Sequence, residues 1–261
     1  MNAHSFVAMG DSFTEGLDDP YPQGSAYRGW ADLVAARLAA EVPAGTFQYA
    51  NLAIRGKLFT AVVEEQVPAG LTMRPDVFAF AAGGNDALRR GFDVAALIAR
   101  FDQVVAALRA TGAEVLLFRF IDVSQVLPGK RLLRPRVEAM NHGVVATALR
   151  HGARVVDLWN DPAFGNPALW SADRLHLGSV GHQRVAAHVL TALGVAPDQR
   201  WLAAPPPPPT LAWTSARSAD LRWAREHLGP WIGRRLTGRS SGDTRTAKRP
   251  ALAPVEANPF G

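Results

Sequence analysis

Short apolar runs alternate with segments of helical periodicity along most of the chain, and this alternation limits the folds open to it. The third run, residues 77–81, is continuously apolar, which is typical of a strand buried on both faces of a parallel sheet. Strands that alternate with helices predict a parallel sheet covered by helices on both sides. We therefore predict an α/β protein with three α/β/α layers and a five-stranded parallel sheet. The predicted strands are residues 5–9, 47–52, 77–81, 115–118 and 155–158, and the predicted helices are residues 29–40, 59–67, 93–110, 136–149 and 179–193.

The chain changes character after Ala196. Five consecutive prolines, residues 205–209, predict a stiff polyproline II spacer. The next segment mixes arginine with tryptophan and leucine, which favours an amphipathic helix that Gly229-Pro230 should break or restart. From Thr237 onward small, basic and proline residues dominate, which is typical of disorder. The predicted organisation is a globular domain over residues 1–198, a Pro-rich linker over 199–212, a helical segment over 213–236 and a disordered basic tail over 237–261.

The positive charge of the chain belongs to this tail. Residues 1–210 carry 19 basic and 19 acidic side chains, whereas residues 211–261 carry nine and four, so the tail supplies the whole net charge of +5. The body therefore lacks the basic signature of a nucleic-acid-binding domain. The tail has three readings: it contacts an acidic surface such as a membrane or nucleic acid, it folds back on the body, or it is plain disorder.

Targeting and redox features are few. The first residues lack the basic and long apolar regions of a signal peptide, and no run approaches the roughly 18 apolar residues of a membrane span. We therefore expect a cytoplasmic protein. The chain has no cysteine, which excludes disulfides, a thiolate nucleophile and cysteine metal ligands.

Four polar motifs follow the predicted strands or precede the last predicted helix. Gly10-Asp11-Ser12 follows the first strand, Gly56 the second and Gly84-Asn85-Asp86 the third, and Asp173-Arg174-Leu175-His176 stands before residues 179–193. Ligand sites in such sheets lie at the carboxyl ends of strands. Together the motifs resemble the SGNH (GDSL-like) hydrolase family, whose name refers to a Ser, a Gly, an Asn and a His from four sequence blocks.

The resemblance extends over roughly residues 4–195 and implies the flavodoxin-like SGNH hydrolase fold. The four named residues correspond to Ser12, Gly56, Asn85 and His176. The first block reads Gly-Asp-Ser-Phe here instead of Gly-Asp-Ser-Leu, which leaves the serine untouched.

The resemblance also implies a role for each residue. Ser12 is the expected nucleophile, His176 the general base, and Asp173 the carboxylate that orients the imidazole and stabilises its charged form. The Ser12 and Gly56 backbone N–H groups and the Asn85 side-chain amide are the expected donors of an oxyanion hole.

Other polar and aromatic residues near the motifs have two candidate roles each. Asp11 caps the turn or takes part in catalysis, and Arg55 is solvated or pairs with an acidic substrate group. Trp170 lines a pocket or belongs to the core. His182 and His188 are expected to be surface or packing residues.

The predicted function is hydrolysis of a small-molecule carboxylic ester or thioester through an acyl-serine intermediate. No cofactor, metal or nucleic acid is implied. The alternatives are a carbohydrate O-acetylesterase or an acyltransferase of the same fold, and, from another class, a non-catalytic scaffold that works through its basic tail. The sequence does not identify the acyl and alcohol groups of the substrate, because loops build the pocket. It also leaves the oligomeric state open.

Overall fold

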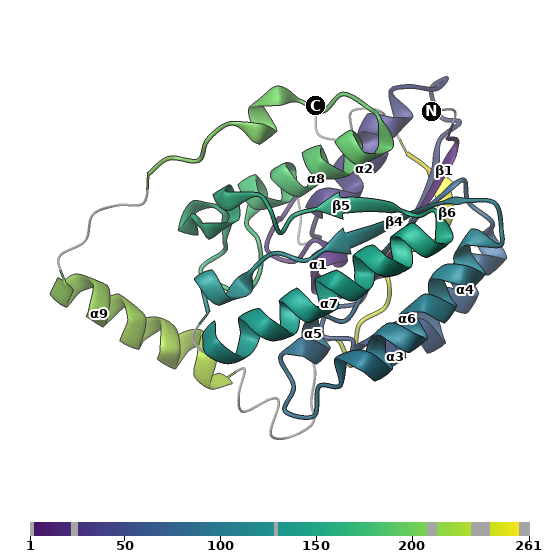
Figure 1. The fold of residues 1–261 in the computed structure, drawn as a ribbon. Helices are drawn as coiled ribbons and strands as arrows, with labels where there is room; N and C mark the ends of the chain where they lie inside the picture. Colours follow the sequence, from purple (N-terminus) through teal and green to yellow (C-terminus); the bar gives the residue numbers. More distant parts are fainter. Residues whose placement is uncertain (1–2, 22–25, 128–129, 208–212, 231–240, 256–261) are drawn as a thin grey trace.

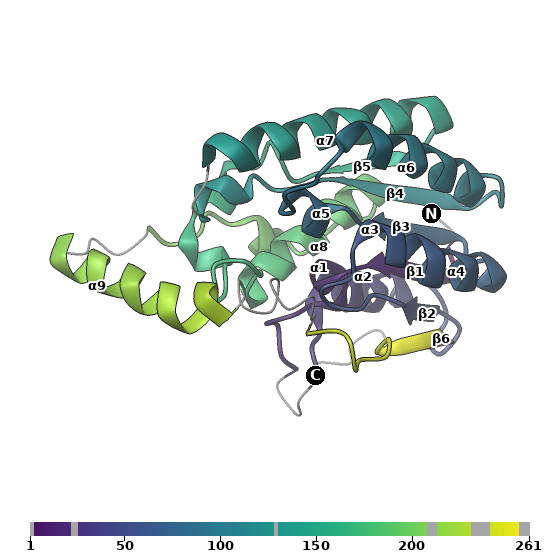
Figure 2. The same cartoon turned by 90° about the horizontal axis from the view of Figure 1, so that it is seen from below.

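The fold is seen in a computed structural model, which describes residues 3–21, 26–127, 130–207, 213–230 and 241–255. Its centre is a sheet with the strand order β5-β4-β3-β1-β2-β6 (Figure 2). The first five strands run parallel, and β6 is antiparallel to its neighbour β2. The strands are β1 (Ser5–Gly10), β2 (Gln48–Asn51), β3 (Val77–Ala81), β4 (Glu114–Arg119), β5 (Arg154–Asp157) and β6 (Arg249–Pro254).

Helices cover both faces of this sheet (Figures 1 and 2). Helices α2 (Gly29–Ala39) and α8 (Ser179–Leu193) pack against each other on one face, and α6 (Val94–Arg109) and α7 (Lys130–His151) pack on the other. The remaining helical elements are α1 (Ser12–Glu15), α3 (Phe59–Ala61), η1 (Val62–Gln66), α4 (Val67–Met73), α5 (Gly84–Ala87), η2 (Val123–Gln125), η3 (Pro162–Gly165), η4 (Pro167–Leu169), η5 (Gln199–Leu202), α9 (Trp213–Trp223) and η6 (Ala224–Leu228).

Two apolar cores, one on each side of the sheet, hold the layers together. Every residue of β3 is buried, because its side chains point alternately into both cores. Trp30 of α2 and Val185 of α8 belong to the first core, and Phe101 of α6 and Met140 of α7 belong to the second. The three-layer α/β/α prediction is therefore confirmed.

The strand order positions a binding site. Strand β1 lies between β2 and β3, so the chain reverses its direction of travel across the sheet at this point. In open α/β sheets, ligands bind beyond the carboxyl ends of the strands where the order reverses. Gly10 at the end of β1 pairs with Ala81 at the end of β3, so the loops that follow these two strands lie side by side.

Two helical stretches are longer than predicted from the sequence, and each contains a proline. The helical stretch that begins at Phe59 continues to Met73 and includes Pro68, which occupies the first turn of α4 after the π-helical turn η1. The π-helical turn η1 directly precedes Pro68, whose missing N–H and ring disturb regular α-helical hydrogen bonding. Helix α7 begins at Lys130 and carries Pro135 inside it, whereas the sequence placed its start at residue 136.

The sheet has six strands, not the predicted five. The sixth, β6, comes from the tail that was predicted to be disordered over residues 237–261; residues 237–240 and 256–261 lie outside the described part of the chain. Strand pairing draws on backbone groups, so a segment of low hydrophobicity can still form a strand on an open sheet edge. Leu252 packs against one core, and Val255 is buried in the other.

A partly buried lysine fixes this strand to the body. Lys248 Nζ donates to the carbonyl oxygens of Tyr27 at 3.0 Å and Arg28 at 2.6 Å, and it lies 2.8 Å from Asp32 Oδ1. All three of its donor positions therefore have an acceptor. Burial lowers the pKa of Lys248, while Asp32 opposes that shift.

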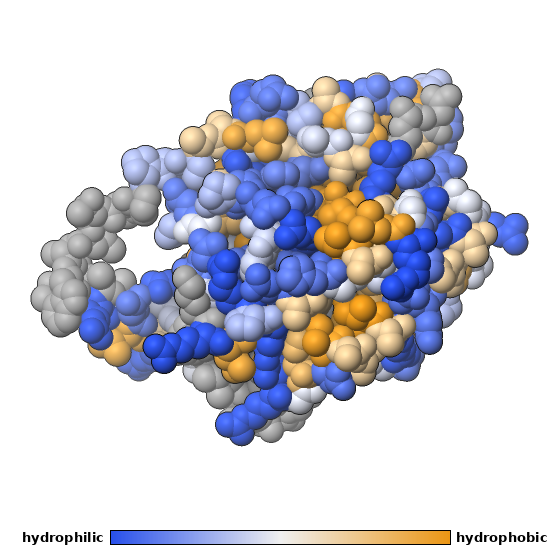
Figure 3. Space-filling view, in the orientation of Figure 1, coloured by the Kyte–Doolittle hydropathy of each residue, from blue (hydrophilic) through white to orange (hydrophobic). Residues whose placement is uncertain are grey.

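Helix α9 occupies part of the predicted helical segment 213–236; residues 231–236 lie outside the described part. It extends away from the body at its amino-terminal end (Figure 1). The face drawn in Figure 3 is largely hydrophilic, with apolar residues gathered near its middle. Within the described ranges, no helix has both the length and the apolar character that a membrane span requires.

Replacing Lys248 with Met should lower the free energy of unfolding by about 1–3 kcal/mol, because two carbonyl groups and a carboxylate lose their donor. Urea denaturation measures the loss. Arg200→Met is the matched control: its side chain is 90% exposed and pairs with Asp198 at the surface. The control should leave the free energy of unfolding nearly unchanged, because exposed ion pairs contribute little. Equal losses in the two variants would contradict a structural role for Lys248.

Candidate active site

Ser12 stands at the first position of α1, and only Asp11 separates it from the end of β1. The turn before it needs a glycine, because a Cβ on Gly10 would lie 2.4 Å from the Ala81 carbonyl oxygen of β3. Asp11 caps α1 by accepting the Phe13 N–H at 3.1 Å. The serine is buried to 8% exposure, so its hydroxyl faces a confined space.

A buried glutamine holds the end of β1 in place. Gln66 Nε2 donates to the Gly10 carbonyl oxygen at 2.9 Å, and Gln66 Oε1 accepts the Gly10 N–H at 2.8 Å. Both polar ends of this side-chain amide are thus used on one residue next to the Ser12 turn. Gln66 could not be predicted from the sequence, because a lone glutamine in a helical stretch carries no motif.

The structure brings Ser12, His176 and Asp173 together. His176 Nε2 lies 3.0 Å from Ser12 Oγ, and His176 Nδ1 lies 2.6 Å from Asp173 Oδ2. With a carboxylate as its acceptor, Nδ1 is the protonated ring nitrogen, which leaves Nε2 to accept the serine proton. A proton can therefore pass from Ser12 to His176 while Asp173 stabilises the charged ring.

The carboxylate of Asp173 is held by its own loop. Its Oδ1 atom accepts the backbone N–H groups of Leu175 at 2.8 Å and His176 at 2.9 Å and the Ser171 hydroxyl at 2.7 Å. Arg174, between these residues, has a left-handed backbone with φ of +58°. Burial raises the pKa of Asp173, but the hydrogen bonds from His176 and the loop N–H groups outweigh burial and hold that pKa below its usual range. Asp173 is therefore ionised at neutral pH.

A second carboxylate faces the imidazole. Asp18 Oδ2 lies 4.0 Å from His176 Nδ1, on the same side as Asp173. The three side chains offer ligand atoms within 4.8 Å of one another. Because the short hydrogen bond to Asp173 engages Nδ1, this geometry is that of an oriented base, and we assign no metal to it. Asp18 lies outside the four sequence motifs, so no signal in the sequence marks it.

Asn85 connects the turns after β1 and β2. Its Nδ2 atom donates to Asp11 Oδ2 at 3.1 Å and to the Lys57 carbonyl oxygen at 3.1 Å. Both hydrogens of the amide therefore have protein acceptors, so donation to a substrate oxygen requires the Asp11 bond to be shared or replaced. Burial raises the pKa of Asp11 to about 6, against the lowering effects of the Phe13 N–H and His176.

Gly56 lies in a turn held by an ion pair. Its φ of +74° is in the left-handed region that favours glycine. The preceding residue, Arg55, donates its backbone N–H to Glu15 Oε2 at 2.7 Å, and its guanidinium pairs with the same carboxylate. Neither role considered for Arg55 fits this pairing. Its side chain is 12% exposed and bound to Glu15 of α1, so it is neither solvated nor directed at a substrate charge. Gly56 is not among the residues that line the described cavity.

A mainly apolar cavity of about 110 Å³ opens onto Ser12, Asn85 and His176. Its apolar lining comes from α1, from the loops after β4 and β5, from α7 and from the segment before α8. These residues include Phe13, Ile121, Val137, Met140, Leu158, Trp170 and Leu177.

The remaining candidates have structural partners. Trp170 fits both of its readings, because it lines the cavity and also donates from Nε1 to the Phe164 carbonyl oxygen at 2.8 Å. His182 packs inside the protein, where Nδ1 accepts the Trp30 N–H at 3.3 Å and burial lowers its pKa to about 4. His188 is half-buried and lies 2.7 Å from Asp161 Oδ2.

The sequence of residues 8–184 matches the GDSL-like Lipase/Acylhydrolase family. The match covers more than half of the chain, so the chain belongs to this family, and the predicted resemblance is confirmed. It is accordingly an enzyme that hydrolyses ester bonds. No curated protein matches the chain.

Solved structures share the fold. TesA is 26% identical with a TM-score of 0.58, and the match covers 72% of this chain and 97% of TesA. LAE5, an alpha/beta hydrolase enzyme from the metagenome of Lake Arreo, Spain, is 23% identical with a TM-score of 0.63, covering 76% and 97%. Axe2, an acetylxylan esterase from Geobacillus stearothermophilus, is 17% identical with a TM-score of 0.60, covering 77% and 97%.

The pKa of Asp11 makes stability depend on pH. A carboxyl group whose pKa is higher in the folded protein binds its proton more tightly there, so this group's contribution to stability falls as pH rises between about 4 and 6. Asp11→Asn removes that loss. We expect the unfolding free energy of the variant, relative to wild type, to increase over this range by at most about 1.4 kcal/mol per pH unit.

Urea denaturation at several pH values measures this difference. Asp198→Asn is the control, because hydrogen bonds from Arg200 lower the pKa of Asp198 and give its linkage the opposite sign. A difference between Asp11→Asn and wild type that stays constant from pH 4 to 7 would contradict a raised Asp11 pKa.

Proposed function

We propose that the protein hydrolyses carboxylic esters through an acyl-Ser12 intermediate, with His176 as general base and Asp173 as its orienting carboxylate. The observation that carries the proposal is the continuous chain of contacts from Ser12 Oγ through the His176 ring to Asp173 Oδ2. Serine is a weak nucleophile unless an adjacent base takes its proton, and this geometry supplies the base.

The reaction has two halves. Ser12 Oγ attacks the carbonyl carbon and gives its proton to His176 Nε2; when the ester C–O bond breaks, the same proton passes to the leaving alcohol. Water then attacks the acyl-serine, His176 takes a proton from the water, and that proton returns to Ser12 Oγ as the acid departs. The carboxylate of Asp173 stabilises the imidazolium in both halves.

The oxyanion that forms in each half needs hydrogen-bond donors. We assign this role to the Ser12 and Gly56 backbone N–H groups and to Asn85 Nδ2. Asn85 is the strongest of the three assignments on distances, because it bridges Asp11 next to the nucleophile and Lys57 next to Gly56. Release of its bond to Asp11 as charge builds on the substrate would make this donation specific to the transition state.

The lining of the cavity favours an apolar acyl chain longer than acetyl. Its walls beyond Ser12 are side chains such as Ile121, Val137 and Met140, which offer no partner for a sugar hydroxyl. Polar groups buried without a hydrogen bond are costly, whereas each buried methylene contributes about 0.8 kcal/mol. We therefore propose that the acyl chain occupies this cavity and that the alcohol group faces its mouth.

Ser12→Ala should lower kcat for a p-nitrophenyl ester by about 10³-fold or more with the fold retained, because the members of such a triad act as a unit. A fluorophosphonate probe should label the wild-type protein at Ser12 and leave the variant unlabelled. A folded Ser12→Ala protein with near-normal kcat would rule out Ser12 as the nucleophile. A folded wild-type protein that neither reacts with the probe nor hydrolyses esters would favour the non-catalytic scaffold.

Filling the cavity should shorten the preferred acyl chain. In Val137→Phe, we expect kcat/KM for an octanoyl ester to fall about tenfold or more relative to the acetyl ester, because the larger ring removes space for several methylenes. The measurement is kcat/KM across a p-nitrophenyl series from acetyl to decanoyl.

The matched control is Leu149→Phe on the same helix α7, where the side chain is 79% exposed. It should leave the chain-length profile unchanged. If Val137→Phe and its control gave the same profile, the acyl chain would not occupy this cavity.

A further inference from the structure

The chain continues well beyond its family match, and this extension returns to the body. The match ends at residue 184, and the neighbouring structures cited above cover 72–77% of this chain although nearly all of their own length is used. Helix α9, η6 and β6 all lie beyond residue 184, outside the family match. Trp223 of α9 and Gly242, in the turn before β6, contact two loops that carry the proposed catalytic groups.

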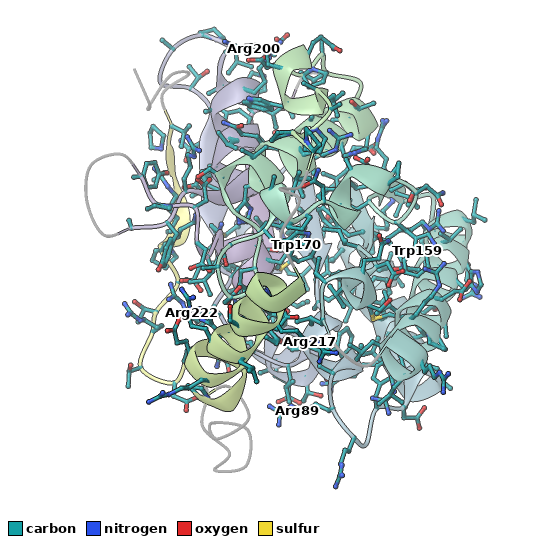
Figure 4. All side chains as sticks on the ribbon, turned by 90° about the vertical axis from the view of Figure 1, so that its left-hand side faces the viewer. Arg89, Trp159, Trp170, Arg200, Arg217 and Arg222 are labelled. Carbon is teal, nitrogen blue, oxygen red and sulfur yellow. The ribbon has the colours of Figure 1, made fainter. Side chains whose placement is uncertain are left out.

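The first contact is on the loop of Asp173 and His176. Trp223 Nε1, at the end of α9, donates to the Asp173 backbone carbonyl oxygen at 2.9 Å. Arg174 stacks its guanidinium 5.0 Å from the centre of the Trp223 ring and pairs with Asp220 at 2.8 Å. Figure 4 looks onto α9 from outside, with the helix in front of the body.

This contact acts on the part of the loop with the least favourable backbone. Arg174 has a φ of +58°, a conformation that costs free energy for a residue with a side chain. The same turn directs the Leu175 and His176 N–H groups onto Asp173 Oδ1. Holding the Asp173 carbonyl and the Arg174 side chain from outside therefore favours the turn that aims the carboxylate at the imidazole.

The second contact is on the turn of Gly56. A Cβ on Gly242 would lie 2.0 Å from the Arg55 carbonyl oxygen and 3.1 Å from Ile54 Cγ2, so the backbone of the extension touches the residue before Gly56. The other side of Arg55 is held by Glu15 of α1. The turn is thus enclosed between the extension and the helix that begins with Ser12.

Strand β6 anchors this contact. It pairs with β2, the strand that leads into the Gly56 turn, and Val255 donates to the Phe47 carbonyl oxygen at 3.0 Å. Lys248 begins a chain of polar contacts from the extension into the body. It pairs with Asp32, which accepts a hydrogen bond from the Tyr49 hydroxyl at 2.7 Å.

From Tyr49 the chain of polar contacts continues to α1. Asn51 Nδ2 donates to the Tyr49 hydroxyl and to the Thr14 carbonyl oxygen, each at 2.9 Å. The extension is therefore connected by consecutive polar contacts to α1, the helix that carries Ser12.

We propose that the C-terminal extension is a positioning element of the active site, in which Trp223 holds the Asp173–His176 loop and Gly242 holds the Gly56 turn. The inference rests on the proposed serine hydrolase function. Neither residue touches the reacting atoms. Each acts through backbone that carries a proposed catalytic group, and small displacements of such groups reduce the rate strongly.

The two contacts predict different kinetic effects, which a merely structural role would not. Trp223→Phe removes the Nε1–H donor and keeps an aromatic ring. Weaker orientation of Asp173 should stabilise the imidazolium less, so kcat should fall about tenfold and the acid limb of the kcat/KM profile should move to lower pH. Gly242→Ala should lower kcat about tenfold through the oxyanion donors, with KM within about twofold and the acid limb unmoved.

Matched controls are available for both variants. Leu221→Ala changes a residue of α9 that is 74% exposed, and Gly91→Ala adds a Cβ where no atom lies within 4 Å. Both should retain wild-type kcat and pH profile. All proteins are full-length, and kcat is normalised to the fraction of sites labelled by a fluorophosphonate.

The outcomes separate this inference from the function on which it rests. A wild-type protein without esterase activity or labelling overturns both. A labelled, active wild type whose Trp223→Phe and Gly242→Ala variants keep its kcat and pH profile overturns the positioning role alone. Should Gly242→Ala fail to fold, Asp220→Asn replaces it as the second test: it removes the charge that pairs with Arg174, and an unchanged kcat and profile in both it and Trp223→Phe overturns the inference.

Discussion

The close pairing of β1 with β3 is the constraint on which the active site depends. Their carboxyl ends meet at Gly10 and Ala81, where only a glycine leaves enough space. Because the strand order reverses there, the turn with Ser12 and the turn with Asn85 emerge next to each other. His176 then joins them from a loop 164 residues further along the chain, and reaches Ser12 Oγ at 3.0 Å. The sheet thus supplies the proximity, and the side chains supply the chemistry.

The two carboxylates nearest the catalytic groups, Asp173 and Asp11, have different electrostatic environments. Asp173 is surrounded by donors and stays ionised, whereas Asp11, one residue before the nucleophile, is buried with fewer donors and has a pKa raised to about 6. A negative charge on Asp11 competes for the same Asn85 amide that an oxyanion would use. The protonation state of Asp11 therefore affects how readily the Asn85 amide can donate to an oxyanion. In this way the turn before Ser12 influences the chemistry of the site.

Apolar periodicity, which is read within a few residues, was sufficient to predict the layers of the fold and to place Ser12 and Asn85 just past the ends of strands. Long-range partners were not predictable in this way. Gln66 reaches Gly10 across 56 positions, and Lys248 reaches Arg28 across 220, and neither residue carries a motif. The composition of the tail suggested disorder, because composition reflects side chains, whereas β6 is held by backbone pairing and by the partly buried ammonium group of Lys248.

Strand β6 also changes what the sheet presents to other molecules. Without it, β2 would end the sheet with unpaired backbone donors and acceptors, the kind of edge that recruits strands from other chains and leads to aggregation. The strand that takes its place contains Pro250 and Pro254, which have no N–H to donate, and begins with the charged Arg249. Proline and charge are the features with which natural proteins discourage further pairing. The extension therefore ends the sheet with a strand that is a poor template for growth.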